Sequence, residues 1–290
     1  MKNSYRQISL SRFCRLLGVT RQAYYQHFWQ VEFKTTEETL VISEVLRIRK
    51  NHKHMGGRKL FEILQPFLLD HKIKMGRDAF FDLLQANNLL VRRKKRKIYT
   101  TQSFHWYRKY PNKIKDIIPS RPNQIWVSDI TYWKINCGYV YISLITDAYS
   151  RKIVGYNVAD TLEAIETTQA LRNALSHVGK NHKGLIHHSD RGIQYCCTEY
   201  VRLLKENHIE ISMTENGDPY ENAQAERVNG ILKEEYLNDY SVEGLAQARL
   251  ILDFVIKIYN TERPHMSCSY KTPEFVHQAC SLKGAKRVSS

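Results

Sequence analysis

Three separate carboxylates limit what this chain can fold into, because each stands where a regular element is expected to begin or end. Asp129 in IWVSDITYW and Asp190 in LIHHSDRGIQY each follow a short apolar run that predicts a strand. Glu226 lies in the first turns of a predicted helix within DPYENAQAERVNGILKEEYL. The intervals are 190 − 129 = 61 and 226 − 190 = 36 positions, so only a folded core can bring the three side chains together.

Carboxylates gathered in this way suit a magnesium ion. This hard cation prefers oxygen ligands, keeps some of its waters and takes its remaining oxygens from substrate phosphate. Asp129, Asp190 and Glu226 therefore indicate a magnesium site for phosphoryl transfer, in which manganese can substitute.

The pattern of elements around these acids predicts an α/β fold. From residue 125 we expect three strands, the second over residues 139–146 and the third over 152–158. A helix over 161–179, a strand over 185–189, a helix over 198–207, a strand over 209–213 and the helix of Glu226 follow. This order is typical of the ribonuclease-H-like fold, a mixed sheet with helices on both faces.

The helix that follows residue 220 has two faces at spacings of three and four residues. Its polar face carries Asn222, Glu226, Asn229 and Lys233. Its apolar face carries Val228, Leu232 and Tyr236 and suits packing on the sheet. Glu226 is therefore expected to point away from the core and toward a site, the alternative being an ordinary solvated glutamate.

Five stretches carry a resemblance to a known family: WVSDITYW, GYVYISLITDAYSRKIVGY, HHSDRGIQY, MTENGDPYENAQAERVNGILKEE and YNTERPHMSCSYKTPEF. In this order they resemble the catalytic half of insertion-sequence transposases of the IS three family. The resemblance is to the second-reading-frame product, a DDE transposase with a retroviral-integrase-like core, and is strong over residues 124–275. One departure is Glu221, where the family has aspartate, and this change keeps the charge.

The resemblance implies an activity and partners. Asp129, Asp190 and Glu226 would be the catalytic and metal-binding residues of a two-metal enzyme that cleaves element ends and joins the 3′ hydroxyl to target DNA. Element-end and target DNA, a homo-oligomer in the synaptic complex and an upstream first-frame product are the implied partners. Two alternatives are a nuclease that only cleaves and a transposase-derived DNA-binding protein without catalysis.

Two further residues of the core are candidate DNA contacts. Lys233 lies on the polar face of the Glu226 helix. Arg263 belongs to an Arg-Pro-His stretch that ends the core in the family, where a phosphate contact and a structural ion pair are both open. Two histidines, His187 and His188, precede Asp190. His188 shares the face of that acid and could orient a water. The alternative is that these histidines only pack or form hydrogen bonds.

The basic charge lies in the first part of the chain. The net charge is +15, with 25 − 9 = +16 over residues 1–120 and 19 − 20 = −1 over residues 121–290. Such asymmetry indicates a polyanion-binding module attached to a near-neutral body, although a solvated basic surface has the same composition.

The N-terminal residues predict small all-α modules. Residues 1–31 read as a helix-turn-helix-like segment, with Gly18 in the turn, Thr20 as N-cap and Arg21 and Gln22 at the start of a possible recognition helix. A hairpin that binds only protein would look the same. A polar linker over 32–38 and a second helix-turn-helix-like bundle over 39–91 are expected next, with helices over 39–51, 58–69 and 76–87.

A basic linker is expected over residues 92–120, before a catalytic core over 121–277 and a disordered tail over 278–290. The linker opens with six adjacent cations that we expect to contact DNA phosphates: Arg92, Arg93, Lys94, Lys95, Arg96 and Lys97. Aromatic residues follow, among them Trp106, Tyr107 and Tyr110, which could stack or pack nearby.

The sequence shows neither a signal peptide nor an apolar run of the ~20 residues that a membrane helix needs. The six cysteines lack the spacing of a zinc site. We therefore expect a soluble, cytoplasmic protein with no membrane partner.

Overall fold

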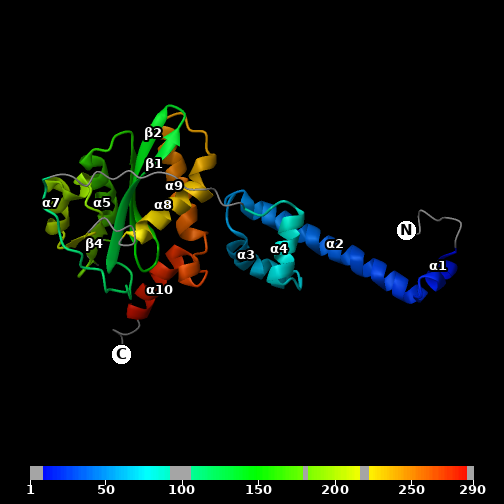
Figure 1. Ribbon diagram of the computed structural model, residues 1–290. Coiled ribbons are helices and arrows are strands. Elements are labelled where there is room, and N and C mark those ends of the chain that lie inside the picture. Colours follow the sequence, from blue (N-terminus) through cyan, green and yellow to red (C-terminus); the bar gives the residue numbers. More distant parts are fainter. Residues whose placement is uncertain (1–8, 92–105, 179–181, 216–221, 286–290) are drawn as a thin grey trace. The chain divides into compact units, whose positions relative to one another are not determined.

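The computed structural model describes residues 9–91, 106–178, 182–215 and 222–285 (Figure 1). The chain divides into two compact units. One comprises Met1–Lys50 with Ile63–Leu90, and the other comprises Asn51–Glu62 with Val91–Ser290. In the described ranges, no helix combines the length and the apolar character needed to cross a membrane.

The first unit begins with two helices, α1 (Leu10–Leu16) and α2 (Arg21–Arg49). Gly18, at φ +68°, makes the turn between them, and Thr20 Oγ1 accepts a hydrogen bond from Ala23 N at 3.0 Å, so the predicted N-cap is confirmed. The linker predicted over residues 32–38 is wrong, because α2 runs through it. No Gly or Pro stands between Arg21 and Arg49, so nothing in the local sequence ends the helix.

Helix α4 (Arg77–Ala86) and the part of α3 (Gly57–Asp70) from Ile63 onward complete this unit, and both helices are close to their predicted bounds. Helices α2, α3 and α4 bury apolar side chains at helical spacing: Val41, Val45, Leu64, Leu68, Phe80 and Leu84. Arg49 Nη2 donates to Leu89 O at 2.9 Å and so ties the end of α2 to the residues after α4.

The second unit is built on a five-stranded sheet in the order β3-β2-β1-β4-β5. The strands are β1 (Ile125–Ile135), β2 (Gly138–Asp147), β3 (Ile153–Ala159), β4 (Ile186–Ser189) and β5 (Glu210–Met213). The first three pair antiparallel, whereas β4 and β5 join parallel beside β1. The predicted mixed sheet is confirmed.

Helices cover both faces of this sheet (Figure 1). One face carries α5 (Ala164–Val178), α6 (Ile193–Cys196) and α7 (Thr198–Glu206), and the other carries α8 (Ala223–Glu235) and α9 (Leu245–Thr261). Helix α10 (Pro273–Ala285) lies against α9, and the short 3-10 helices η2 (Leu237–Asp239) and η3 (Met266–Cys268) connect these elements. Two hydrophobic clusters result, one on each face.

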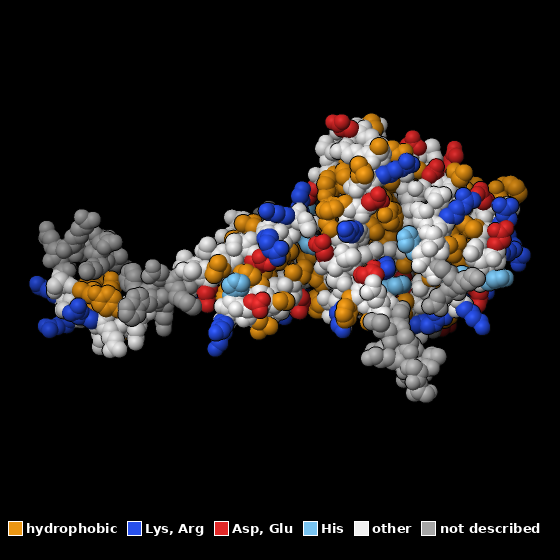
Figure 2. All heavy atoms as spheres, turned by 180° about the vertical axis from the view of Figure 1, so that it is seen from behind, with side chains coloured by type: hydrophobic (Ala, Val, Ile, Leu, Met, Phe, Trp, Pro, Cys, Tyr) orange, Lys and Arg blue, Asp and Glu red, His pale blue; other side chains and the backbone are white. Residues whose placement is uncertain are grey.

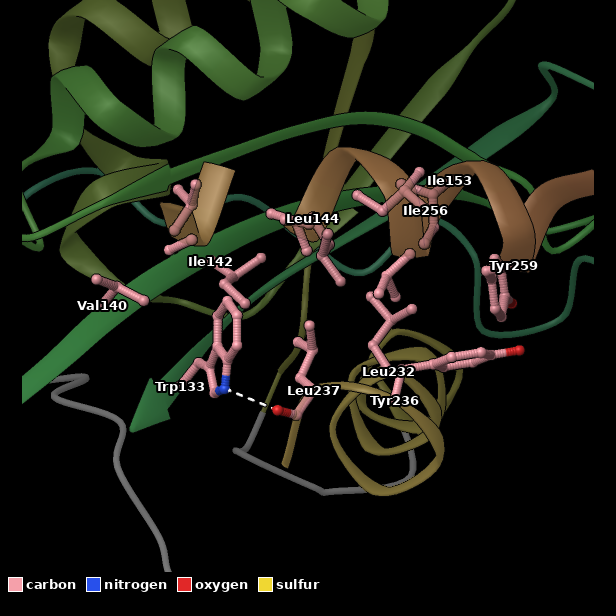
Figure 3. Close-up of a cluster of buried hydrophobic side chains, with 14 of the residues drawn as sticks. Trp133, Val140, Ile142, Leu144, Ile153, Leu232, Tyr236, Leu237, Ile256 and Tyr259 are labelled. Atoms are coloured by element: carbon pink, nitrogen blue, oxygen red, sulfur yellow. Dashed lines mark hydrogen bonds between the residues drawn. The ribbon is translucent and has the colours of Figure 1, made fainter. Parts of the chain in front are cut away.

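Trp133 of β1 is at the centre of the cluster on the α8 side (Figure 3). Its side chain is buried, and its Nε1 donates to Leu237 O at 3.1 Å, so the indole nitrogen keeps a partner. Val228 and Leu232 of α8 and its C-cap Tyr236 are buried in the same cluster. The predicted apolar face of α8 is therefore confirmed, and its opposite face is free to serve the site.

On the other face, Gly155 allows α5 to approach β3 closely. A Cβ built on this glycine would lie 2.5 Å from both Ala170 O and Ala174 Cβ of α5. Since real atoms do not come so close, any side chain at position 155 would push the helix off the sheet.

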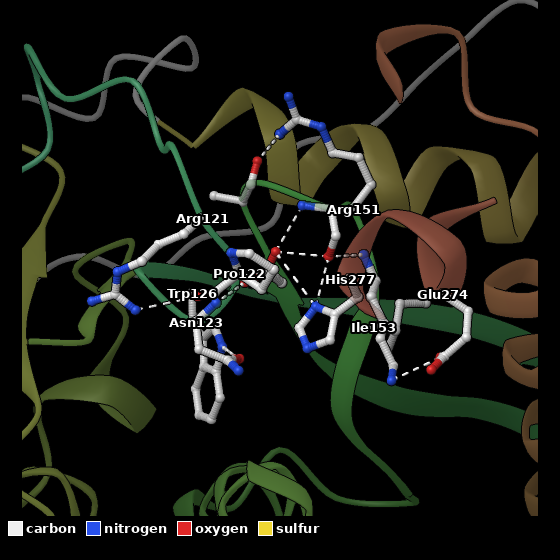
Figure 4. Close-up of polar contacts among 12 residues, drawn as sticks. Arg121, Pro122, Asn123, Trp126, Arg151, Ile153, Glu274 and His277 are labelled. Atoms are coloured by element: carbon white, nitrogen blue, oxygen red, sulfur yellow. Dashed lines mark hydrogen bonds and ion pairs between the residues drawn. The ribbon is translucent and has the colours of Figure 1, made fainter. Parts of the chain in front are cut away.

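The tail predicted from residue 278 is wrong as far as Ala285, because α10 continues to that residue. Figure 4 shows His277 of α10 directed at the turn between β2 and β3. His277 Nδ1 lies 2.9 Å from Ser150 Oγ, which in turn donates to buried Asp147 at 2.7 Å. Lys152 also pairs with Glu274 at 2.7 Å, so α10 is fixed to this turn, while residues 286–290 lie outside the described part.

Candidate active site

The pairing of β1 with β4 brings the two aspartates together. The parallel register joins Ile125 to Ile186 and Val127 to His188, a constant offset of 188 − 127 = 61 positions. The same offset relates Asp129 to Asp190, which directly follows the last residue of β4. Asp129 lies within β1, which continues to Ile135, so the site forms where the shorter strand ends beside the longer one.

The polar face of α8 lies along β1 at this position. Asn222 Nδ2 donates to Ser128 O at 3.1 Å, Asn229 Nδ2 donates to Asp129 Oδ2 at 2.7 Å, and Lys233 Nζ lies 3.4 Å from Thr131 Oγ1. Glu226 stands four residues after Asn222 and three before Asn229, so it shares this face. Its side chain is exposed, which leaves the carboxylate available to a ligand.

The pKa of Asp129 depends on the charges of the other two acids. Burial raises the pKa of Asp129, the charge of Asp190 raises it further and Glu226 adds to the effect, whereas hydrogen bonds from Asn229 and Ile130 oppose it. The result is a pKa of about 7. Asp129 therefore interacts unfavourably with the other two acids when it ionises.

This charge fits a divalent cation, although the carboxylates do not form a ready-made cage. Among the described residues, no three His, Cys, Asp or Glu side chains lie close enough together to hold a metal ion by themselves. Magnesium needs only one or two protein carboxylates beside water and substrate phosphate. The donor set of Asp129, Asp190 and Glu226 is thus chemically suited to the ion that the sequence predicts.

The two histidines before Asp190 are buried. His187 Nε2 lies 2.7 Å from Ser128 Oγ and 2.9 Å from Tyr200 OH, and burial together with the charge of His188 lowers its pKa to about 3. His188 Nδ1 lies 2.9 Å from Ser212 Oγ of β5. The full burial of His188 and its contact with Ser212 favour the packing alternative.

Tyr195 of α6 is a neighbour of the site that the sequence did not single out. Its side chain is buried, and the charges of Asp129 and Asp190 add to burial in raising its pKa well above the usual value. Its hydroxyl oxygen has no hydrogen-bond partner among the described residues. Asn229, which the sequence placed only on a polar face, is the other group missed, and its spacing of three from Glu226 was the available signal.

Lys233 lies on the site side of α8. Its Nζ is 3.9 Å from the centre of the Tyr132 ring, and burial lowers its pKa while the charge of Asp129 opposes this shift. The ammonium group therefore remains next to Asp129, and its predicted contact with DNA stays a prediction.

For Arg263 the structural ion pair is the correct alternative, and the phosphate contact is wrong. The side chain is only 1% exposed, and its Nε and Nη2 donate to Glu235 Oε2 and Oε1, both at 2.8 Å. Glu235 ends α8 and also pairs with Lys59 at 2.9 Å. Arg263 therefore holds the end of α8 in place, and its buried guanidinium is not open to a ligand.

The other predicted DNA contacts lie away from the acids in the sequence. Arg21 and Gln22 are exposed at the start of α2 in the first unit. The basic run, residues 92–97, and Glu221 lie outside the described residues. On the face of the second unit seen in Figure 2, basic and acidic side chains are interspersed, in agreement with the near-zero net charge of residues 121–290.

Comparisons with known proteins agree with this geometry. Two models of the integrase core domain match residues 119–219 and 207–273. An uncharacterized 31 kDa protein of insertion element IS600 from Shigella sonnei is 33% identical over 257 residues, covering 87% of this chain and 92% of that protein. The chain belongs to the insertion-sequence transposases of the IS three type, which carry an integrase core.

The chain is also similar to a second transposase and to the core of a retroviral integrase. The transposase for insertion sequence element IS904 of Lactococcus lactis is 30% identical over 247 residues, covering 78% of this chain and 96% of that protein. The HTLV-2 integrase catalytic core domain in complex with magnesium aligns with a TM-score of 0.44 at 22% identity, covering 54% of this chain and 97% of that structure. The family assignment indicates DNA transposition as the process in which the chain acts.

Proposed function

We propose that the chain cleaves the ends of an insertion sequence and joins the resulting 3′ hydroxyl to target DNA. What supports the proposal most is that β4 ends beside Asp129 with Asp190 as the next residue, and that the charges of Asp190 and Glu226 add to burial in raising the pKa of Asp129 to about 7. Neighbouring carboxylates of this kind are suited to phosphoryl transfer.

In this mechanism Asp129, Asp190 and Glu226 would hold two magnesium ions, which would lower the pKa of an attacking water and stabilise the leaving 3′ oxygen. Asn229 holds the Asp129 carboxylate in position through its 2.7 Å hydrogen bond, and Lys233 supplies a positive charge beside it. After hydrolysis, the 3′ hydroxyl replaces water in a second in-line displacement, so no covalent enzyme intermediate is needed.

The deciding experiment incubates the chain with labelled element ends, target DNA and magnesium, and maps the 3′ ends of the products. Cleavage followed by joined products supports the proposal. Cleavage without joining would assign the chain to the nuclease alternative, and binding without either would assign it to the DNA-binding alternative.

The first prediction concerns the metal. Activity is expected with magnesium or manganese, whereas calcium should support DNA binding without cutting, since its longer and looser coordination does not hold the in-line geometry. Because metal competes with the proton on Asp129, the apparent affinity for manganese should fall as the pH falls below about 7. Titration of manganese between pH 6 and 8 tests this, and equal cleavage in a chelator would exclude metal catalysis.

The second prediction concerns the basic run, residues 92–97. Replacing all six residues by Gln should weaken binding to specific and random duplexes alike, because phosphate contacts carry no sequence information. The slope of log K against log salt should flatten by up to ~0.9 for each phosphate that the variant no longer neutralises. Binding titrations at several salt concentrations measure this slope, and an unchanged slope would leave the run as a solvated linker.

The third prediction concerns Arg21 and Gln22 at the start of α2. Replacing both by Ala should reduce discrimination between element-end and random DNA, by about 1–3 kcal/mol for each side chain that reads a base well. The salt slope should change little, so this variant is distinguishable from the previous one. If the ratio of element-end to random DNA affinity is unchanged, another part of the chain or a partner must recognise the sequence.

A further inference from the structure

Trp106 lies on the surface with 87% of the residue exposed, whereas Trp126 and Trp133 are buried. Its indole stacks on the ring of Tyr107, with 4.7 Å between ring centres and 18° between the planes. An indole so exposed loses the hydrophobic stabilisation that usually places tryptophan in a core. The stack instead presents a wide aromatic face to solvent.

The core of the second unit holds this stack in place. Tyr107 and Tyr110 pack against the hydrophobic cluster that contains Tyr195 and Cys196 of α6. Just beyond, Pro111 O accepts a hydrogen bond from Met213 N at 3.3 Å, and Lys113 N donates to Ser212 Oγ at 2.8 Å. The chain after the stack is therefore anchored along β5, and Tyr107 anchors the stack itself to the core.

The same contacts place this platform of two stacked rings near the acids. Helix α6 begins only three residues after Asp190. Burial and the charge of Asp190 raise the pKa of the Cys196 thiol to about 11, while the charge of Lys109 opposes this shift. Asp190 and Lys109 therefore both lie close to this thiol. The segment of Trp106 thus borders the side of the core on which Asp190 stands.

The charges around the platform favour one kind of partner. The guanidinium of Arg108 lies 5.3 Å from the centre of the Tyr110 ring, and Lys109 follows it. An aliphatic patch would accept any apolar surface, whereas planar rings flanked by cations match a nucleobase and its phosphate. This combination is the one that proteins use for single-stranded nucleic acid.

We propose that Trp106 and Tyr107 form a stacking platform for an unpaired DNA base beside the catalytic carboxylates. The inference rests on the proposed function, because it supplies the strand that the acids would cut. Opening a base pair next to the reacting phosphate costs free energy, and stacking of the freed base on an aromatic ring offsets part of this cost.

The test measures binding of a single-stranded oligothymidylate without metal, followed by the quenching of tryptophan fluorescence. Wild-type fluorescence should be quenched, and Trp106→Phe should abolish most of the change while keeping the affinity. Trp106→Ala should weaken single-strand binding roughly 5- to 100-fold, with a smaller effect on a fully paired hairpin. Ile118→Ala is the matched control, because Ile118 is 89% exposed but has no aromatic face, and its affinity should match the wild type.

Several results would overturn the proposal. Equal single-strand affinity of wild type and Trp106→Ala would do so, as would an equal loss on single strands and closed hairpins. The failure of the proposed function is seen separately, because it requires that the wild type with magnesium leave labelled element ends uncut. The cleavage assay needs metal and the single-strand binding assay does not, so the two failures can be told apart.

Discussion

Asp129→Asn, Asp190→Asn and Glu226→Gln are each expected to reduce cleavage and strand transfer by roughly a thousandfold or more, a loss typical of groups that act as one catalytic unit. Each substitution removes one negative charge and hardly any volume. Binding of element-end DNA should remain, because the basic first part of the chain is unchanged. Single-turnover cleavage and a binding titration on the same preparation measure the two quantities.

Glu234→Gln is the matched control for Glu226→Gln. Glu234 is also exposed on α8 but lies outside the polar face of Asn222, Glu226, Asn229 and Lys233. This control should keep wild-type activity. Retained strand transfer in one of the three acid variants would remove that residue from the site.

The stability of Asp129→Asn separates lost chemistry from lost folding. The pKa of Asp129 is about 7 in the folded protein against an ordinary value of 3.8, so the folded state holds this proton more tightly than the unfolded state does. Without metal, the wild type therefore loses stability as the pH rises from about 4 to 7, and Asn, which does not ionise, avoids this cost. In chelator at pH 8 the variant should melt at the wild-type temperature or above it.

The proximity of Asp129 to Asp190 could be predicted from sequence because strand register depends on local pattern. The apolar runs before Asp129 and Asp190 identified two strands, and parallel pairing at an offset of 61 then brought both acids to one place. Helical spacing likewise assigned Glu226 and Val228 to opposite faces of α8. The sequence did not show that β1 continues past Asp129 to Ile135 while β4 ends just before Asp190, because the local pattern does not show how far each strand extends.

What the sequence did not predict depends on contacts between distant residues. Helix α10 is fixed by His277 and Glu274 to a turn more than a hundred residues earlier, so nothing local marks residues 278–285 as ordered. The polar residues 32–38 suggested a linker, yet a polar stretch without Gly or Pro can also continue a helix. His188 stands two residues before Asp190, as expected for the same face of a strand. Its side chain is nevertheless buried and lies against Ser212 of β5, a contact that the local sequence does not show.

Arg263 illustrates the same limit and leads to the second large effect, which is on stability. Glu235 accepts two hydrogen bonds from Arg263 and one from Lys59. Burial raises the pKa of Glu235, but the bonds and charges of these two partners outweigh it and lower the value to about 2. Glu235 is thus a largely buried carboxylate whose charge depends on its cationic partners, at the end of the helix that carries Glu226.

Arg263→Met is therefore expected to lower the free energy of unfolding by about 3–5 kcal/mol, the range found when one partner of a buried pair is removed. Lys59 remains beside Glu235, which favours the lower end of this range. Urea titration followed by the fluorescence of the buried Trp126 and Trp133 reports the unfolding of this core. Arg172→Met is the matched control: Arg172 and Glu199 are an exposed pair at 2.9 Å, and their loss should cost no more than about 1 kcal/mol.

The pH dependence of this effect has a definite sign. The folded pKa of Glu235 lies below its ordinary value of 4.5, so the stability that its ionisation contributes is complete above pH 4.5 and is lost as the pH falls toward about 2. The difference between wild type and Arg263→Met should therefore be largest near neutral pH and should narrow between pH 4.5 and 2. A difference that stays constant over this range would mean that Arg263 acts by filling space, and equal urea midpoints for Arg263→Met and Arg172→Met would remove the pair from any role in holding α8.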